Sequence, residues 1–337
     1  MNELPRLHAD LFARHAALRE RTRHVLGDAD WAEHLPYVDA ILSLKREKRA
    51  VILAHNYQAP EIFHGVADIV GDSLALAQRA VDVDADIIVM AGVHFMAETA
   101  KLLNPGRTVL IPDAAAGCSL AESITAADIR LLRQRYPGVP VVTYVNTSAE
   151  VKAESDICCT SANAVQVVES LGVPRVLFLP DQYLGQYVAS KTRVEIILWQ
   201  GSCEVHERFS GQQLRDYRQQ LGPVHLLAHP ECPQDVLAEA DFVGSTAAMI
   251  HHLDRLRPPR VVMVTECSMS DNVAVRFPDI EFTRPCQLCP HMKRITLPGI
   301  LAALEQTQLV VDVAPGIAAK ARLAVQRMLD IGRREAA

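Results

Sequence analysis

Three cysteines recur at nearly equal intervals along this chain of 337 residues: Cys118, Cys203 and Cys289 lie 85 and 86 positions apart. Each has a glycine or a proline close by, which is typical of loops. Three thiolates can bind three irons of a cubane cluster and leave the fourth iron open to a substrate, where it would act as a Lewis acid. The spacing therefore predicts a [4Fe–4S] site suited to dehydration and condensation, provided that the three loops meet in space.

Cys286 offers an alternative, because the spacing Cys286-x-x-Cys289 also suits zinc or a redox-active dithiol. The sequence has no second C-x-x-C pair to complete a four-cysteine zinc site, although histidines such as His291 would be available. We therefore favour Cys289 as the cluster ligand and interpret Cys286 as a free or redox-active neighbour. Four cysteines lack a periodic partner and are interpreted as small buried residues: Cys158, Cys159, Cys232 and Cys267.

Polar side chains follow three β-branched runs that are typical of buried parallel strands. The runs begin at positions 51, 141 and 225, and the residues after them are His55, Asn56, Tyr57, Tyr144, Asn146, His229 and Glu231. The carboxyl ends of parallel strands usually face the ligand crevice. If the three ends converge, they would line one pocket able to orient an anionic substrate and transfer protons. Taken singly, each residue is equally well explained as a hydrogen-bonded residue that finishes a strand.

Hydroxyl residues follow each strand end and precede an expected helix: Ser73, Ser161, Ser245 and Thr246. Such hydroxyls and the neighbouring backbone N–H groups can bind carboxylate or phosphate oxygens. Plain N-capping explains any one of them equally well. The sequence contains neither a Walker motif nor a clean G-x-G-x-x-G, so a nucleotide cofactor is not supported.

These features repeat with a common period of about 85 residues, which indicates three homologous α/β units. We expect three-layer α/β/α (Rossmann-like) domains with short parallel sheets, packed around a pseudo-threefold axis so that their cysteine loops point inward. The alternative is that strands in any α/β protein recur at loosely regular intervals. The expected segments are a helical 1–49, broken near Gly27 and Pro36, the units 50–138, 139–222 and 223–310, and a C-terminal helix at 311–337.

Composition narrows the class of protein. Hydrophobic residues make up 49% of the chain but aromatic residues only 5%, which suits buried strands packed on aliphatic helices. With 34 Lys and Arg against 40 Asp and Glu, the net charge of −6 argues against a nucleic-acid partner. No apolar run approaches the ~20 residues of a membrane helix, and the charged N-terminus does not resemble a signal peptide. We expect a cytoplasmic protein whose eight cysteines are thiols or metal ligands.

The residues named above belong to a series of short motifs that resembles the quinolinate synthase family from about residue 50 to residue 310. In order along the chain, the motifs are AHNY (54–57), GDS (71–73), GVHFMAET (92–99), AGCSL (116–120), YVN (144–146), CTSAN (159–163), Cys203 with His206 and Glu207, HPEC (229–232), GST (244–246), TE (265–266) and CPHMK (289–293). Some members of the family carry a longer C-x-x-C-x-x-C cluster. Here only Cys286 and Cys289 are present, and position 292 is Met.

The resemblance implies three α/β domains in a triangle around a [4Fe–4S] cluster held by Cys118, Cys203 and Cys289. It also implies condensation of iminoaspartate (iminosuccinate) with dihydroxyacetone phosphate to quinolinate, phosphate and water. Quinolinate is the precursor of the NAD ring. A further expected partner is the enzyme that makes the labile imine, L-aspartate oxidase or aspartate dehydrogenase.

We assign roles within that reaction as hypotheses. Glu231, paired with His229, is the principal acid–base group, and Tyr57 assists proton transfer. The groups expected to bind substrate carboxylates or phosphate are His55, Ser73, Tyr144, Asn146, Ser161, His229, Glu231, Ser245 and Thr246. We assign no role to His206 by resemblance, because the residues just after the second cluster ligand vary in the family.

Two other classes of protein remain open at this point. A non-catalytic iron–sulfur sensor or electron carrier would use the same cysteines with a fully ligated cluster, and Cys286 would then be the fourth ligand. The polar strand ends argue against a carrier, which needs no such pocket. A zinc-dependent hydrolase or a protein with structural zinc would be colourless and indifferent to air.

Overall fold

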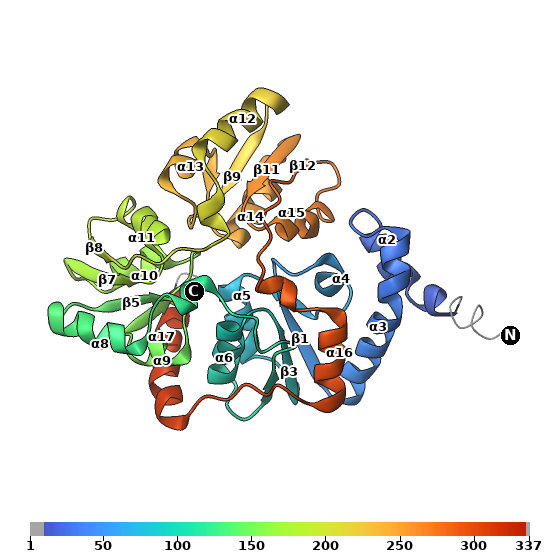
Figure 1. Ribbon diagram of the computed structural model, residues 1–337, viewed down its shortest axis with the longest axis horizontal. Helices are drawn as coiled ribbons and strands as arrows, with labels where there is room; N and C mark the ends of the chain where they lie inside the picture. Colours follow the sequence, from blue (N-terminus) through green and yellow to red (C-terminus); the bar gives the residue numbers. More distant parts are fainter. Residues whose placement is uncertain (1–9, 335–337) are drawn as a thin grey trace.

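The structure, a computed structural model, describes residues 10–334 and contains three parallel sheets with the same strand order. The orders are β2-β1-β3-β4, β6-β5-β7-β8 and β10-β9-β11-β12 among the described residues. The second strand of each unit in chain order lies at one edge, and the first strand lies inside. Three α/β units with short parallel sheets are therefore confirmed, and Figure 1 shows them as three lobes around a centre.

The first unit is sandwiched between two helical layers. Its strands are β1 (Ala50–His55), β2 (Ile69–Gly71), β3 (Ile87–Ala91) and β4 (Thr108–Leu110). Helices α5 (Ser73–Val81) and α6 (His94–Leu103) lie on one side, and α3 (Asp28–Glu47) and α16 (Leu297–Gln306) lie on the other (Figure 1). Shorter helices are α2 (Ala16–Thr22), α4 (Pro60–Phe63) and α7 (Ser119–Glu122). The late helix α16 thus completes a layer of the first unit.

The second unit alternates its strand residues between two cores, as a period of two requires. Its strands are β5 (Val141–Tyr144), β6 (Ile157–Cys159), β7 (Arg175–Leu179) and β8 (Glu195–Leu198). Val141 packs with Ile129 and Val151, whereas Val142 faces the core shared with the first unit. The helices are α8 (Ala126–Arg135), α9 (Ala149–Ala153), α10 (Ala164–Ser170) and α11 (Gln182–Ala189), and α17 (Pro315–Arg334) packs against α9 and β6.

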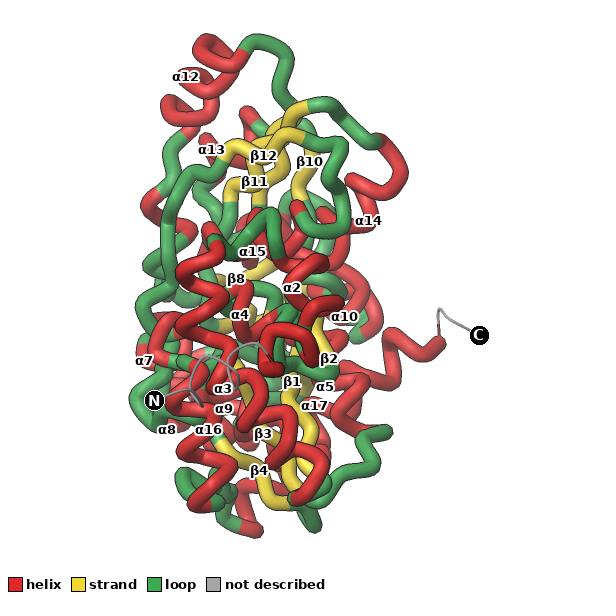
Figure 2. Tube along the Cα trace, turned by 90° about the vertical axis from the view of Figure 1, so that its right-hand side faces the viewer, coloured by secondary structure: helices red, strands yellow, loops and turns green. Residues whose placement is uncertain are grey.

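The third unit shows the same alternation. Its strands are β9 (His225–Ala228), β10 (Phe242–Val243), β11 (Arg260–Val264) and β12 (Glu281–Thr283), and its helices are α12 (Gly211–Leu221), α13 (Gln234–Glu239), α14 (Thr246–Leu256) and α15 (Cys267–Ala274). Leu226 packs with Leu214 of α12, whereas its neighbour Leu227 packs with Met249 of α14. Figure 2 shows strands β10 to β12 above the strands of the first unit.

Several local expectations need correction. Pro36 lies inside α3 and does not break it, because the buried Leu35, Val38 and Ile41 hold the helix on its neighbours. The break at Gly27 is confirmed, since Gly27 is the N-cap of α3. Of the expected helix-opening hydroxyls, only Ser245 is an N-cap; the N-cap of α5 is Asp72 and that of α10 is Asn163.

The segment boundaries stay a prediction, and part of the expected N-terminal and C-terminal segments lies outside the described residues. Among residues 10–334, no helix combines the length and apolar character needed to cross a membrane.

The docking of α17 yields a stability test. Leu329 is fully buried against the second unit, whereas Leu323 on the same helix is 52% exposed. Because a buried leucine leaves a cavity when truncated, Leu329→Ala should cost about 2–5 kcal/mol of unfolding free energy. The matched variant Leu323→Ala should change it by no more than about 0.5 kcal/mol. Denaturant unfolding monitored by circular dichroism measures both, and equal losses would contradict the packing described.

Candidate active site

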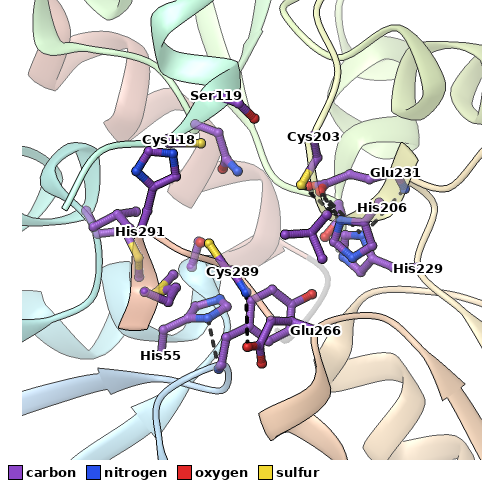
Figure 3. A pocket seen from close by; sticks show the side chains of 18 of the residues that line it. His55, Cys118, Ser119, Cys203, His206, His229, Glu231, Glu266, Cys289 and His291 are labelled. Carbon is purple, nitrogen blue, oxygen red and sulfur yellow. Dashed lines mark hydrogen bonds and ion pairs between the residues drawn. The ribbon is translucent and has the colours of Figure 1, made fainter. Parts of the chain in front are cut away.

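The three units meet at a cavity that is lined by residues of all three. It receives residues from the carboxyl ends of strands in all three units, among them His55, Tyr144 and His229. Figure 3 shows the lining side chains directed inward from three sides. The convergence arises because equivalent ends of three similar parallel sheets face one centre.

Each of the three periodic cysteines follows the fourth strand of its unit and precedes a short helix. Cys118 is the N-cap of α7, Cys203 precedes η1 (His206–Arg208), and Cys289 precedes η2 (Met292–Arg294). All three line the cavity, and Figure 3 shows them reaching toward the same space. The structure therefore brings together three thiols that are far apart in the sequence.

Burial disfavours the charged form of these three thiols, so a thiolate at any of them needs a positive charge beside it. Burial raises the pKa of Cys118 to about 12, and burial likewise raises the pKa of Cys203 and of Cys289. At neutral pH such thiols are protonated unless a positive charge stabilises the thiolate, which a metal ion does on binding. Three sulfur donors directed from three sides into one cavity fit an iron–sulfur cluster.

Cys286 lies apart from this group. Its side chain is exposed and its Sγ lies 3.1 Å from Sγ of Cys267, and neither residue lines the cavity. The expectation that Cys267 is buried is confirmed, as it is for Cys158, Cys159 and Cys232. Cys289 rather than Cys286 therefore has the position expected of a third ligand.

A second donor group overlaps the first. The ligand atoms of Cys203, His206 and Glu231 lie within 4.8 Å of one another, close enough to hold a single metal ion. However, His206 Nδ1 lies 2.8 Å from Glu231 Oε2, as a hydrogen-bonded pair does. A metal bound to both would replace that hydrogen bond, so this group fits a paired acid–base site better than a metal site.

Glu231 is a buried carboxylate surrounded by donors. Its Oε1 accepts a hydrogen bond from the hydroxyl of Tyr144, and its Oε2 lies 3.9 Å from Nδ1 of His229. Burial by itself would raise the pKa of Glu231. The adjacent His229 and His206 and the hydrogen bonds from His206 and Tyr144 outweigh burial and lower that pKa to about 2. Glu231 is therefore an ionised base at neutral pH.

Two histidines of the cavity are neutral at pH 7. Burial lowers the pKa of His229 to about 3 and that of His55 to about 4, against the attraction of Glu231. The rings of His229 and His206 stack with centroids 4.7 Å apart, and the ring of His55 meets Tyr57 edge-on. Burial, followed by the charge of Glu231, raises the pKa of Tyr57, so its hydroxyl keeps its proton.

The N-termini of two helices open onto the cavity. Ser73 and Thr246 are the first residues of α5 and α14, and both line the cavity, as does Ser161 in the turn before α10. Backbone N–H groups at helix N-termini attract anions. Asn146 lines the same space, and its Oδ1 has no hydrogen-bond partner among the described residues, so it can accept a bond from a ligand.

Asn56 and Ser245 were both predicted at the site, but the described cavity lining includes neither. The side-chain amide of Asn56 instead donates a hydrogen bond to the hydroxyl of Thr246. Ser245 is explained by local helix structure. Its hydroxyl accepts a hydrogen bond from the backbone N–H of Ala248, so it acts as a helix cap. The competing N-cap interpretation therefore describes this residue, whereas the other predicted residues converge.

The structure adds lining residues for which sequence reasoning assigned no role: Asp72, Phe95, Met96, Ser119, Thr160, Glu204, Glu266 and His291. Glu266 follows β11 and accepts a hydrogen bond from the backbone N–H of Cys289, and it pairs with Lys293 at 3.1 Å. It stands just past the carboxyl end of the third strand of its unit. The carboxyl end of a third strand is thus as strong a signal for a site residue as that of a first strand.

Comparison with known proteins identifies one family. A family model described as quinolinate synthetase A protein matches residues 39–330. The chain is 67% identical over 316 residues to quinolinate synthase 2 of Mesorhizobium japonicum, covering 94% of this chain and 98% of that protein. It is 66% identical to a quinolinate synthase of Agrobacterium fabrum, covering 94% of this chain and 92% of that protein. It is also 66% identical to a quinolinate synthase of Xylella fastidiosa, covering 87% of each.

The loop that carries Cys203 depends on a glycine. A Cβ on Gly201 would lie 2.6 Å from the carbonyl oxygen of Pro180, which is backbone and cannot rotate away. Gly201→Ala should therefore destabilise the protein by about 1–3 kcal/mol, as overpacking does. Gly106→Ala is the control, because no heavy atom lies within 4 Å of its added Cβ. Denaturant unfolding compares them, and an unchanged Gly201→Ala protein would disprove the close approach.

Proposed function

We propose, because this chain belongs to the quinolinate synthase family, that it condenses iminoaspartate with dihydroxyacetone phosphate to quinolinate, phosphate and two waters. The chain is an enzyme, and the function of its family lies in NAD biosynthesis. The observation that carries the proposal is the meeting of Cys118, Cys203 and Cys289 with the Glu231 network in one cavity. Neither an electron carrier nor a structural zinc site requires an ionised base and free acceptors beside the cysteines.

Cys118, Cys203 and Cys289 would hold a [4Fe–4S] cluster at this cavity. When bound through three cysteines, such a cluster supplies a Lewis-acidic iron that polarises an oxygen or nitrogen and eases loss of water. The three thiols lose their protons when the metal binds, which the raised pKa of Cys118 would otherwise oppose.

The remaining cavity groups divide into binding and proton-transfer groups. The N-termini of α5 and α14, at Ser73 and Thr246, would bind the carboxylate and phosphate groups of the substrates. Asn146 would accept a hydrogen bond through its unpartnered Oδ1. Binding of two anionic substrates would depend on these neutral groups and on the helix N-termini, because the described lining contains no lysine or arginine.

Proton transfer is assigned to Glu231, His229 and Tyr57. The lowered pKa keeps the carboxylate of Glu231 ionised at neutral pH and so free to accept a proton, and the neutral ring of His229 would be the base paired with it. The hydroxyl of Tyr57 keeps its proton, because burial raises its pKa. On substrate binding it would turn this hydrogen from Thr265, its partner in the present structure, to a leaving or developing oxyanion. The dense packing around Glu231 would exclude bulk water from these steps.

Two wider expectations belong with this proposal. The imine substrate hydrolyses readily, so functional coupling to L-aspartate oxidase or aspartate dehydrogenase would deliver it. A cytoplasmic location would keep the cysteines reduced, and all eight are free thiols in the described chain.

The metal assignment is tested by substituting single cysteines. Anaerobically prepared wild-type protein should be brown and carry about four irons and four sulfides per chain. Serine at position 118, 203 or 289 should each abolish the brown absorbance, because each removes one thiolate from a three-thiolate site. Cys286→Ser is the matched control and should keep the full iron content, since Cys286 lies outside the cavity. Stoichiometric zinc in colourless wild-type protein would overturn the assignment.

The acid–base assignment is tested by Glu231→Gln, which keeps the size of the side chain and removes its charge. Turnover should fall by about 10²- to 10⁴-fold, the usual contribution of a positioned acid–base group. Iron and sulfide content should stay at the wild-type value. Glu239→Gln serves as the control, because Glu239 forms only a surface ion pair with Arg215 in the same unit. Full turnover by a loaded Glu231→Gln enzyme would contradict the assigned role.

A further inference from the structure

Thr265 links two groups of the active site that come from different parts of the chain. Its hydroxyl oxygen lies 2.6 Å from the hydroxyl of Tyr57 and 2.9 Å from Nε2 of His206. Thr265 is fully buried directly after β11, and Tyr57 follows β1 of the first unit. A single hydroxyl therefore joins a residue of the first unit to the histidine that follows Cys203.

The other end of His206 decides the direction of these hydrogen bonds. Nδ1 of His206 lies 2.8 Å from Oε2 of Glu231, and a carboxylate only accepts. Nδ1 must therefore carry the hydrogen. We take the ring of His206 as the neutral imidazole, whose one N–H is then on Nδ1, so that Nε2 presents a lone pair toward Thr265.

The hydroxyl of Thr265 has one hydrogen, and it is used on this lone pair. Its oxygen is then an acceptor and takes the hydrogen bond from the hydroxyl of Tyr57. The hydrogen bonds run in one direction, from Tyr57 through Thr265 and His206 to Glu231. Tyr144 donates to the other oxygen of Glu231, so each carboxylate oxygen at the end of the series has a donor.

We propose that Thr265 is a positioning residue of the active site, which holds His206 with Nδ1–H toward Glu231 and Cys203 and holds the hydroxyl of Tyr57 beside it. Nδ1 of His206 also lies 3.2 Å from Sγ of Cys203, so the orientation fixed by Thr265 sets which atom faces a cluster ligand. The catalytic part of this inference rests on the proposed function. The hydrogen-bond part does not.

The structure contains few substitutes for this hydroxyl. Within the described residues, the contact to Nε2 of His206 is the hydroxyl of Thr265, and the residue is buried away from bulk water. Loss of the hydroxyl would leave a lone pair of His206 and the hydroxyl of Tyr57 without partners. Such buried groups reorient or admit water, and either change moves them from their working positions.

Three variants separate positioning from packing. Thr265→Val replaces the hydroxyl by a methyl group of similar size, and Thr265→Ser keeps the hydroxyl. Thr143→Val is the matched control: Thr143 of β5 is also fully buried, and the partner of its hydroxyl within residues 10–334 is Ser155, outside the cavity. The loaded enzymes are compared by kcat and KM for quinolinate formation, by iron content and by thermal unfolding.

We expect kcat of Thr265→Val to fall about 10- to 100-fold, as for other groups that orient a functional histidine. KM and iron content should stay near the wild-type values. Thr265→Ser should restore kcat to within about threefold, because the donor to Nε2 returns. Thr143→Val should keep kcat even if its unfolding temperature falls. Wild-type kcat in Thr265→Val, or an equal loss in Thr143→Val, would overturn the proposal.

A second measurement does not depend on activity. Nitrogen-15 NMR of the full-length chain with labelled histidine, before and after anaerobic loading with iron and sulfide, reports which ring nitrogen carries hydrogen. His206→Gln assigns the signal. We expect Nδ1–H and a hydrogen-bonded, unprotonated Nε2, whose signal moves to that of a free lone pair in Thr265→Val.

The kinetic and NMR measurements distinguish failure of the Thr265 role from failure of the proposed function. An Nε2–H signal in the wild type, or an unchanged Nε2 signal in Thr265→Val, overturns the role of Thr265 whatever the reaction is. A wild-type enzyme that forms no quinolinate but gives the expected NMR signals would instead refute the proposed function and leave the hydrogen-bond assignment intact.

Discussion

A buried negative charge is the constraint on which the site depends. The carboxylate of Glu231 is almost fully excluded from water, and a lone charge there would be strongly destabilising. It is stabilised by hydrogen bonds from Tyr144 of the second unit and from His206 in the loop after Cys203. These donors come together only when the units are packed as observed. The position and charge of Glu231 therefore depend on how the three sheets pack against one another.

Repetition of a small α/β unit explains why the cysteines meet although they are far apart in the sequence. In each unit the cysteine follows the fourth strand, and all four strands run parallel. Equivalent loops therefore lie at the same edge of each sheet, and three sheets around one centre bring three loops together. The helices that fall outside the repeat have a different role. The chain returns at α16 to cover the first unit and at α17 to cover the second.

Features with a repeated physical cause were predictable from the sequence. The first and third strands of each unit, the α/β class and the cysteine period all depend on patterns that extend over many residues. The second and fourth strands were missed, because runs as short as Phe242–Val243 have no readable periodicity. Ser161 and Ser245 show the limit at single residues: the same residue type lines the cavity in one case and caps a helix in the other. Thr265 was quoted within a motif but had no role, since its contacts to Tyr57 and His206 depend on tertiary packing.

The central claim is that one cavity combines a cysteine-held cluster with an acid–base network for condensation and dehydration. The most direct measurement incubates anaerobically loaded enzyme with carbon-13-labelled dihydroxyacetone phosphate and freshly generated iminoaspartate, and follows quinolinate and phosphate together. If the proposed condensation is right, we expect labelled quinolinate and phosphate in equal amounts, formed only when both substrates are present. A fully loaded brown enzyme that releases neither, or that releases phosphate without quinolinate, would contradict it.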